Sequence, residues 1–134
     1  MKAGILGSGM VGQAISARLA ELGHNVMIGT RDANKLNAWQ ALNQNIKIGS
    51  FAETAAHAEM VFNATSGGGS LQALQMADAS NLNGKILVDI SNPLDYSKGF
   101  PPFLHVINTD SLGEQIQRAF PSVKVVKTLN TVTA

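Results

Sequence analysis

The stretch KAGILGSGMVG, residues 2–12, is followed by a helical run and then by NVMIG, residues 25–29. This order predicts a strand, a glycine-rich turn, a helix and a second strand. Gly7 can adopt the tight turn, Gly9 has no Cβ that would keep a pyrophosphate away from the backbone, and Gly12 allows the helix to approach the strand closely. The first turn of the helix then directs its free N–H groups at a bound phosphate.

The context of the glycine pattern makes it informative, because G-x-G-x-x-G alone has only three fixed positions. Here the pattern follows an apolar strand, opens an amphipathic helix and lies in a unit of about 30 residues, the size of a dinucleotide-binding βαβ unit. The alternative, an ordinary tight turn, fits this context less well. We therefore predict that a dinucleotide binds at the turn and the first helical residues, which are Gly7, Ser8, Gly9, Met10, Val11 and Gly12.

The end of the second strand distinguishes the two nicotinamide cofactors. In NAD-binding proteins an acidic residue about 20 positions after the glycines binds the ribose 2′-hydroxyl. Thr30 stands in that region here, 18 positions after Gly12, and Arg31 follows it. A carboxylate would repel a 2′-phosphate, whereas a hydroxyl and a guanidinium both bind one. The sequence therefore favours NADP(H).

Two further charged residues lie close to this position. Asp32 is an acidic residue, but it lies two positions after Thr30, where the ribose-binding acid of an NAD-binding protein is expected. It also precedes a helical stretch, where aspartate is a preferred N-cap. We expect its carboxylate to accept hydrogen bonds from backbone N–H groups. Lys35 either reaches back to the phosphate that Arg31 holds or is an ordinary solvated helix lysine, and both assignments are compatible with the sequence.

Length and composition exclude several classes of function. The 134 residues fit one domain, and a net charge of +1 with 14% charged residues gives no electrostatic signature of nucleic-acid or anionic-membrane binding. The absence of cysteine excludes disulfides, thiolate nucleophiles and cysteine metal sites. The first predicted strand begins at residue 2, which leaves no room for a secretory leader, and no apolar run reaches the ~18 residues of a membrane span. We expect a cytoplasmic protein with no metal site and no membrane or nucleic-acid partner.

The rest of the chain alternates short apolar strands with helical stretches. Strands are predicted at residues 45–49, 60–64, 85–90 and 124–127, and helices at 33–43, 50–58, 71–76 and 111–120. This alternation predicts an α/β fold with a doubly wound (Rossmann), mainly parallel sheet of about six strands in the order 3-2-1-4-5-6. In such a sheet, ligands bind in the crevice at the carboxyl ends of strands 1 and 4, where both glycine loops fall.

Local patterns add detail to two of the helices. Leu36, Trp39 and Leu42 recur at three-residue steps, the spacing of a one-sided helix, and Trp39 is expected in the core. Ser111 and Glu114 match a capping box at the start of the last helix.

Two loops are candidates for the nicotinamide end of the site. Residues 65–70 (TSGGGS) form either a backbone bay for the nicotinamide ribose or substrate or a flexible connector; an engineered linker is disfavoured, because the loop joins a strand to a helix at a regular place. Pro93 holds Asn92 extended, so that the amide can meet the nicotinamide, or the pair is a simple Asn-Pro turn. The predicted residues here are Thr65, Ser66, Gly67, Asn92 and Pro93.

Residues 96–108 form a connection longer than most in a compact domain, and long loops are often functional. Phe100 and Phe103 either cover a planar ring or close the core. His105 could donate a proton, although a single histidine is more often a packing or surface residue.

Taken together, these residues resemble the deazaflavin-dependent NADP reductase family, the NADP oxidoreductases that use coenzyme F-420. The N-terminal domain of that family is shared with pyrroline-5-carboxylate reductase. The resemblance covers the whole chain and is carried by residues 4–12, Gly29-Thr30-Arg31 with Lys35, residues 89–94 (DISNPL), residues 99–102 (GFPP) and residues 125–131 (VVKTLNT).

The resemblance implies roles for particular residues. In that family a serine or threonine and an arginine after the second strand, with a lysine one helical turn later, hold the 2′-phosphate; here these are Thr30, Arg31 and Lys35. The family reaction is direct hydride transfer between NADP(H) and the deazaflavin ring, which needs stacking and positioning more than a proton donor, so no acid–base residue is assigned. A deazaflavin user should have an aromatic-lined bay with few acids beside Gly67 and Asn92. The alternatives are an NADPH-dependent imine or carbonyl reductase, which needs a proton donor, and a non-enzymatic NADP-binding module.

Family members usually continue for several dozen residues beyond the equivalents of Asn130 and Thr131. The resemblance therefore implies that residues 1–134 form an NADP-binding domain whose C-terminal segment for substrate and dimer contacts is absent. We expect the site for a small-molecule hydride acceptor to be incomplete unless two chains associate as a homodimer.

Overall fold

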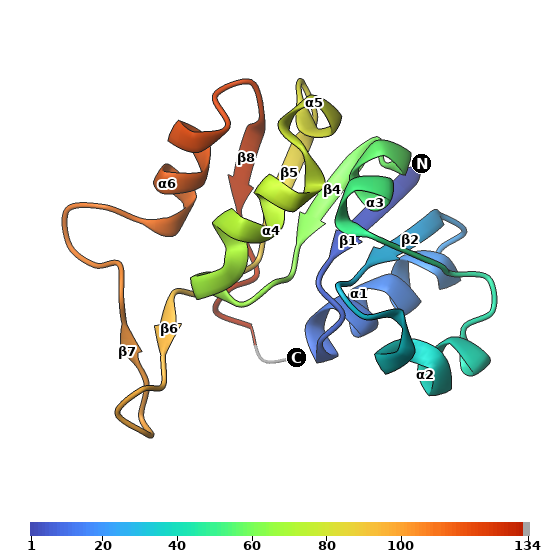
Figure 1. Ribbon diagram of the computed structural model, residues 1–134, viewed down its shortest axis with the longest axis horizontal. Helices are drawn as coiled ribbons and strands as arrows, with labels where there is room; N and C mark the ends of the chain where they lie inside the picture. Colours follow the sequence, from blue (N-terminus) through green and yellow to red (C-terminus); the bar gives the residue numbers. More distant parts are fainter. Residues whose placement is uncertain (133–134) are drawn as a thin grey trace.

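The computed structural model describes residues 1–132. A parallel sheet of six strands forms the centre of the fold (Figure 1). Its strands are β1 (Lys2–Leu6), β2 (Asn25–Gly29), β3 (Lys47–Gly49), β4 (Met60–Asn63), β5 (Ile86–Asp89) and β8 (Lys124–Lys127). They lie in the order β3-β2-β1-β4-β5-β8. Because β8 is the sixth strand to join the sheet, this is the predicted order 3-2-1-4-5-6, and the Rossmann assignment is confirmed.

The register aligns the carboxyl ends of neighbouring strands. Leu6, the last residue of β1, lies opposite Gly29 of β2 and Asn63 of β4. Asn63 in turn lies opposite Asp89 of β5, which lies opposite Lys127 of β8. The loops that leave these strands therefore start from one row across the sheet, so residues distant in sequence come together at this edge.

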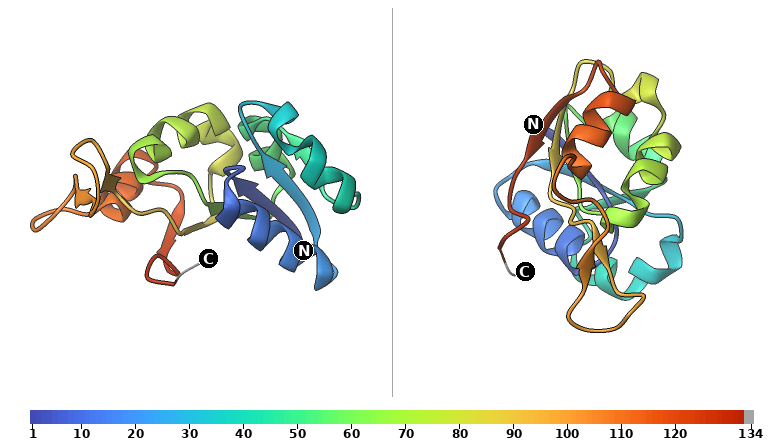
Figure 2. Two further views of the ribbon diagram at one scale, coloured as in Figure 1. Left: turned by 90° about the horizontal axis from the view of Figure 1, so that it is seen from below. Right: turned by 90° about the vertical axis from the view of Figure 1, so that its left-hand side faces the viewer.

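Helices cover both faces of the sheet. They are α1 (Met10–Glu21), η1 (Ala33–Leu36), α2 (Asn37–Leu42), α3 (Phe51–His57), η2 (Gly67–Gly69), α4 (Ser70–Ala77), α5 (Ala79–Leu82) and α6 (Leu112–Ala119). Figure 2 shows α1 on one side of the sheet and α3 and α4 on the other.

The core forms two clusters, one on each face, because alternate strand residues point in opposite directions. Ile5, Val26 and Ile28 pack with residues of α1 and α2. Leu6 and Val61 pack with residues of α3, α4, α5 and α6. Every one of these five strand residues is fully buried.

The second helical stretch departs from the sequence prediction. It is a 3-10 turn followed by the six-residue α2, and Leu42 is 86% exposed rather than part of a continuous apolar face. A three-residue step keeps to one side of a 3-10 turn but drifts around an α-helix, so the face that includes Leu36 does not reach Leu42. Trp39 is half-buried against the core, as predicted.

A complete capping box starts α3, whereas the box predicted for α6 forms only in part. Ser50 and Glu53 form a reciprocal capping box at α3. At α6, the Ser111 hydroxyl accepts a hydrogen bond from the Glu114 backbone N–H at 3.2 Å, which is one half of the predicted box.

The long connection between β5 and α6 contains a small antiparallel hairpin, β6 (Leu94–Asp95) and β7 (Phe103–Leu104), which projects away from the sheet (Figure 1). Phe100 and Phe103 are 89% and 60% exposed. The interpretation that they close the core is therefore wrong, because the hairpin carries them away from it.

Candidate functional site

The glycine turn after β1 has the geometry of a phosphate cradle. Gly7 adopts φ +114°, a conformation that favours glycine. A Cβ on Gly12 would overlap the carbonyl oxygen of Gly7, so α1 starts directly against the turn. A Cβ on Gly9 would meet nothing within 4 Å, and Gly9 caps α1 without a side-chain hydrogen bond. Open space therefore lies over the first turn of a twelve-residue helix whose terminal N–H groups no capping side chain occupies, an arrangement that in general suits an anion.

The end of β2 lies beside this turn. The hydroxyl oxygens of Ser8 and Thr30 are 3.0 Å apart, within hydrogen-bond distance. Thr30 is 9% exposed, and its Oγ1 also accepts a hydrogen bond from the Asp32 backbone N–H at 3.2 Å. The Asp32 carboxylate accepts a hydrogen bond from the Asn34 backbone N–H at 3.1 Å, which confirms the predicted N-cap. The carboxylate that could have bound a ribose hydroxyl is thus engaged in starting η1.

Both predicted cations of this region are exposed. Arg31 and Lys35 border the same cleft as the glycine turn, and within residues 1–132 neither forms an ion pair with a carboxylate. Their charges are therefore available to an anion in the cleft.

The cleft has a volume of about 240 Å³ and joins residues from five segments of the chain. It brings together eight of the predicted site residues: Gly7, Ser8, Gly9, Thr30, Arg31, Lys35, Thr65 and Ser66. Four residues of α3 and α4 that were not predicted from the sequence also line it: Phe51, Gln72, Ala73 and Met76. These have no sequence signal as ligand contacts, because Phe51, Ala73 and Met76 read as apolar residues of a packed helix and Gln72 reads as an ordinary exposed helix residue.

The glycine loop after β4 is an ordered 3-10 turn, η2. Gly67 is buried, and a Cβ there would overlap the carbonyl oxygen of Asn92, so the loop packs directly on the Asn92-Pro93 backbone. This close approach explains the need for glycine at position 67 and does not fit a flexible connector or a linker.

The structure separates Asn92 and Pro93 from the first cleft. The Asn92 side-chain amide donates a hydrogen bond to the carbonyl oxygen of Asn130 at 2.6 Å. Asn92 and Pro93 line a second cavity of about 540 Å³, which lies between the β6–β7 hairpin, α6 and β8. Met10, Val11 and Gly12 form the first turn of α1, and Val11 and Asn92 border a third, apolar cavity.

The lining of the second cavity differs from the expected bay. Its apolar residues are aliphatic, Leu104, Val106, Leu112 and Val125, and no aromatic residue is among those that line it within residues 1–132. The expected aromatic residues instead lie on the exposed hairpin. His105 is also exposed there, and its backbone N–H donates to the Pro93 carbonyl oxygen at 2.9 Å.

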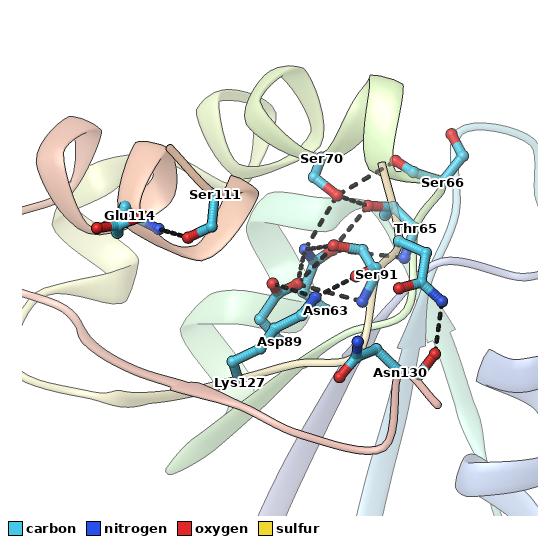
Figure 3. Close-up of polar contacts among 11 residues, drawn as sticks. Asn63, Thr65, Ser66, Ser70, Asp89, Ser91, Ser111, Glu114, Lys127 and Asn130 are labelled. Carbon is cyan, nitrogen blue, oxygen red and sulfur yellow. Dashed lines mark hydrogen bonds and ion pairs between the residues drawn. The ribbon is translucent and has the colours of Figure 1, made fainter. Parts of the chain in front are cut away.

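A buried polar network joins the ends of β4, β5 and β8 (Figure 3), and the sequence analysis did not predict it. Asp89 and Asn63 are fully buried. One Asp89 oxygen accepts hydrogen bonds from the Asn63 amide at 2.8 Å and the Ser91 hydroxyl at 2.6 Å. The other forms an ion pair with Lys127 at 2.9 Å. A polar residue at the end of each of three apolar strands is the signal that could have indicated this network.

The sequence profile of the family described as "NADP oxidoreductase coenzyme F420-dependent" matches residues 2–93, which include the glycine turn, the β2 end and the Asn92-Pro93 pair. The chain belongs to this family. It is therefore an NADP-binding domain of the oxidoreductase type, and the family resemblance drawn from the sequence is confirmed.

Individual relatives are similar over almost the whole chain. Metalloreductase STEAP3 of Rattus norvegicus is 31% identical over 134 residues, which are 99% of this chain and 25% of that protein. A crystal structure from Arthrobacter sp. FB24, provisionally described as an F420-dependent NADP-reductase, is 53% identical with a TM-score of 0.93, and the match covers 98% of this chain and 63% of that chain. The chain thus spans a quarter of the length of the rat protein and just under two-thirds of the length of the Arthrobacter protein.

An imine reductase of Streptomyces aurantiacus has the same fold at 17% identity and a TM-score of 0.69, over 95% of this chain and 39% of that chain. Separately, no helix within residues 1–132 is long and apolar enough to cross a membrane.

Proposed function

We propose that this chain selects NADP(H) over NAD(H) and takes part in hydride transfer between NADP(H) and a deazaflavin-type acceptor. The observation that carries the first part is the composition of the cleft at the end of β2. Thr30 stands where an NAD-binding protein has an acid, Arg31 and Lys35 border the same space, and the Asp32 carboxylate is engaged as a helix cap.

Each part of the cleft has a distinct task in binding. The glycine turn and the first turn of α1 hold the diphosphate with backbone N–H groups. Arg31 and Lys35 neutralise the 2′-phosphate, and the Thr30 hydroxyl turns from the Asp32 backbone to donate to a phosphate oxygen. Gln72 and Met76 of α4 cover the adenosine side of the cleft. A 2′-hydroxyl offers neither cation a charge to neutralise, which is the physical basis of the selectivity.

The family description and the Arthrobacter relative support the deazaflavin acceptor, whereas the expected aromatic lining beside Asn92 is replaced by aliphatic residues and gives it no support. Bound NADPH supplies a hydride from its nicotinamide ring, and direct transfer to a planar acceptor needs alignment rather than a proton donor. Asp89, the buried carboxylate next to the Ser91-Asn92-Pro93 loop, is already engaged by Lys127, Ser91 and Asn63. An imine or carbonyl reductase would instead need an acid within hydrogen-bond reach of the reacting atom.

The test is to mix the chain with NADPH and one acceptor at a time, and to follow the loss of nicotinamide absorbance. The acceptors are the deazaflavin, pyrroline-5-carboxylate and a ferric chelate, the last chosen because the rat relative is named a metalloreductase. Oxidation with the deazaflavin alone supports the proposal. Oxidation with the imine alone would favour the imine reductase, and binding of NADPH without oxidation by any acceptor would favour a binding module.

A further inference from the structure

The polar network around Asp89 adjoins the Ser91-Asn92-Pro93 loop, the predicted nicotinamide end of the site, and has no task in the function proposed so far. Asn63, Asp89 and Lys127 are opposite one another in the register, each at the end of its strand. In a parallel sheet, residues in one row point to the same face, so their side chains meet (Figure 3).

The network connects three loops. Asn63 accepts a hydrogen bond from the Thr65 hydroxyl at 2.7 Å, which fixes the loop after β4. Asp89 accepts from the Ser91 hydroxyl, and the Lys127 ammonium donates to the Ser91 carbonyl oxygen, which fixes the loop after β5.

The third loop is the segment after β8. The Thr128 backbone N–H donates to the Asp89 carbonyl oxygen at 3.1 Å, and the Asn92 amide donates to the Asn130 carbonyl oxygen. Two side chains therefore join the loop after β5 to the end of β8 and the segment that follows it, Lys127 through the Ser91 carbonyl oxygen and Asn92 through the Asn130 carbonyl oxygen.

A contribution to stability does not by itself account for this arrangement. Asp89 is fully buried, whereas the Lys127 side chain is 34% exposed. Burying the carboxylate costs desolvation energy that its attraction to a partly solvated ammonium often fails to recover, and a well-packed neutral pair is frequently as stable. What a charged, fully hydrogen-bonded pair does provide is a fixed geometry, because the Lys127 ammonium can satisfy its donors only when Asp89 and the Ser91 carbonyl are both in place.

We propose that Asp89 and Lys127 are positioning residues for the nicotinamide half of bound NADP(H). They hold Ser91-Asn92-Pro93 against Gly67 and the 128–130 segment, so that the loops are ordered before the cofactor arrives. This inference rests on the proposed NADP(H) site and adds residues that do not touch the cofactor. Without the pair, these loops would have to be ordered on binding, which weakens the affinity for the nicotinamide half alone.

The test compares two ligands. NADPH occupies both halves of the site, whereas adenosine 2′,5′-bisphosphate occupies only the cleft with Arg31. The variant is D89N/K127M, which removes both charges and leaves no unpaired buried ion. Lys124→Met is the matched control, because Lys124 is an exposed lysine at the other end of β8. We expect D89N/K127M to bind NADPH about tenfold more weakly, the order expected when a few loop residues must be ordered on binding. Its affinity for the bisphosphate should stay within twofold of the wild type, and the fluorescence anisotropy of bound NADPH should fall.

The outcomes separate this inference from the proposed function. Wild-type NADPH affinity in the double variant, or equal losses for both ligands, would overturn the positioning role while NADP(H) binding stands. A wild-type chain that binds neither ligand would overturn the proposed function itself. Should the double variant not fold, Ser91→Ala keeps both charges and removes the 2.6 Å contact with Asp89 together with the long 3.5 Å contact with the Asn63 amide. It should show a smaller loss in the same direction, and unchanged NADPH affinity in that variant would contradict the proposal.

Discussion

Replacing Arg31 with alanine should weaken NADPH binding and leave NADH binding almost unchanged. A hydrogen bond to a charged group contributes about 1.5–3 kcal/mol. Arg31 is exposed and Lys35 borders the same cleft, so solvent and the remaining cation reduce the loss. We therefore expect the lower end of this range, about 1.5 kcal/mol, which is roughly a tenfold rise in Kd.

The assay is titration of wild type and R31A with each cofactor at low and at high salt. The difference between the proteins should shrink as salt screens the phosphate contact. Arg18→Ala is the control, because Arg18 is an exposed arginine on α1 that pairs with Glu21 and does not border the cleft. Equal losses of NADPH and NADH affinity in R31A would refute the reasoning, since they would place Arg31 at a part of the cofactor that both dinucleotides share.

Two further predictions concern the glycine turn and the capping box. Gly12→Ala should lower both the thermal stability and the NADPH affinity, because the added Cβ overlaps the Gly7 carbonyl oxygen. Gly9→Ala should keep the melting temperature of the wild type and weaken only the NADPH affinity, because its Cβ meets no protein atom. A G12A variant with wild-type stability and NADPH affinity would contradict the turn geometry. Hydrogen bonds from the Ser50 backbone and hydroxyl lower the pKa of Glu53, so its ionised form stabilises the fold at neutral pH and this contribution is lost as the pH falls through the lowered pKa. Urea unfolding at pH 7 and pH 4 should therefore show a smaller loss of stability on acidification in Glu53→Gln than in the wild type, and identical losses would argue against the assignment.

The sheet order and the phosphate turn could be predicted because they depend on local patterns. Each strand is a short apolar run between turn residues, and the glycine spacing fixes the first crossover, so connection rules leave few arrangements. The N-cap role of Asp32 was also predictable, since it requires only that an aspartate precede a helical stretch. The same local reasoning placed Thr30 and Arg31 at the edge of the cleft.

The parts that could not be predicted depend on contacts between distant segments. Phe51 and Met76 enter the cleft because α3 and α4 pack beside the glycine turn, which no pattern within either helix reveals. The Asp89–Lys127 pair depends on the pairing of β5 with β8, and its residues are 38 positions apart. The sequence left open whether Phe100 and Phe103 cover a planar ring or close the core, and the second alternative is wrong; an apolar loop has no periodicity that shows which way its side chains point.

The central claim, that the cleft at the end of β2 recognises a 2′-phosphate, is tested most directly by calorimetric titration of the wild-type chain with NADPH and NADH under the same buffer and salt. The account predicts that NADPH binds at least tenfold more tightly, the effect of about one charge-assisted phosphate contact. Equal affinities, or tighter binding of NADH, would contradict it.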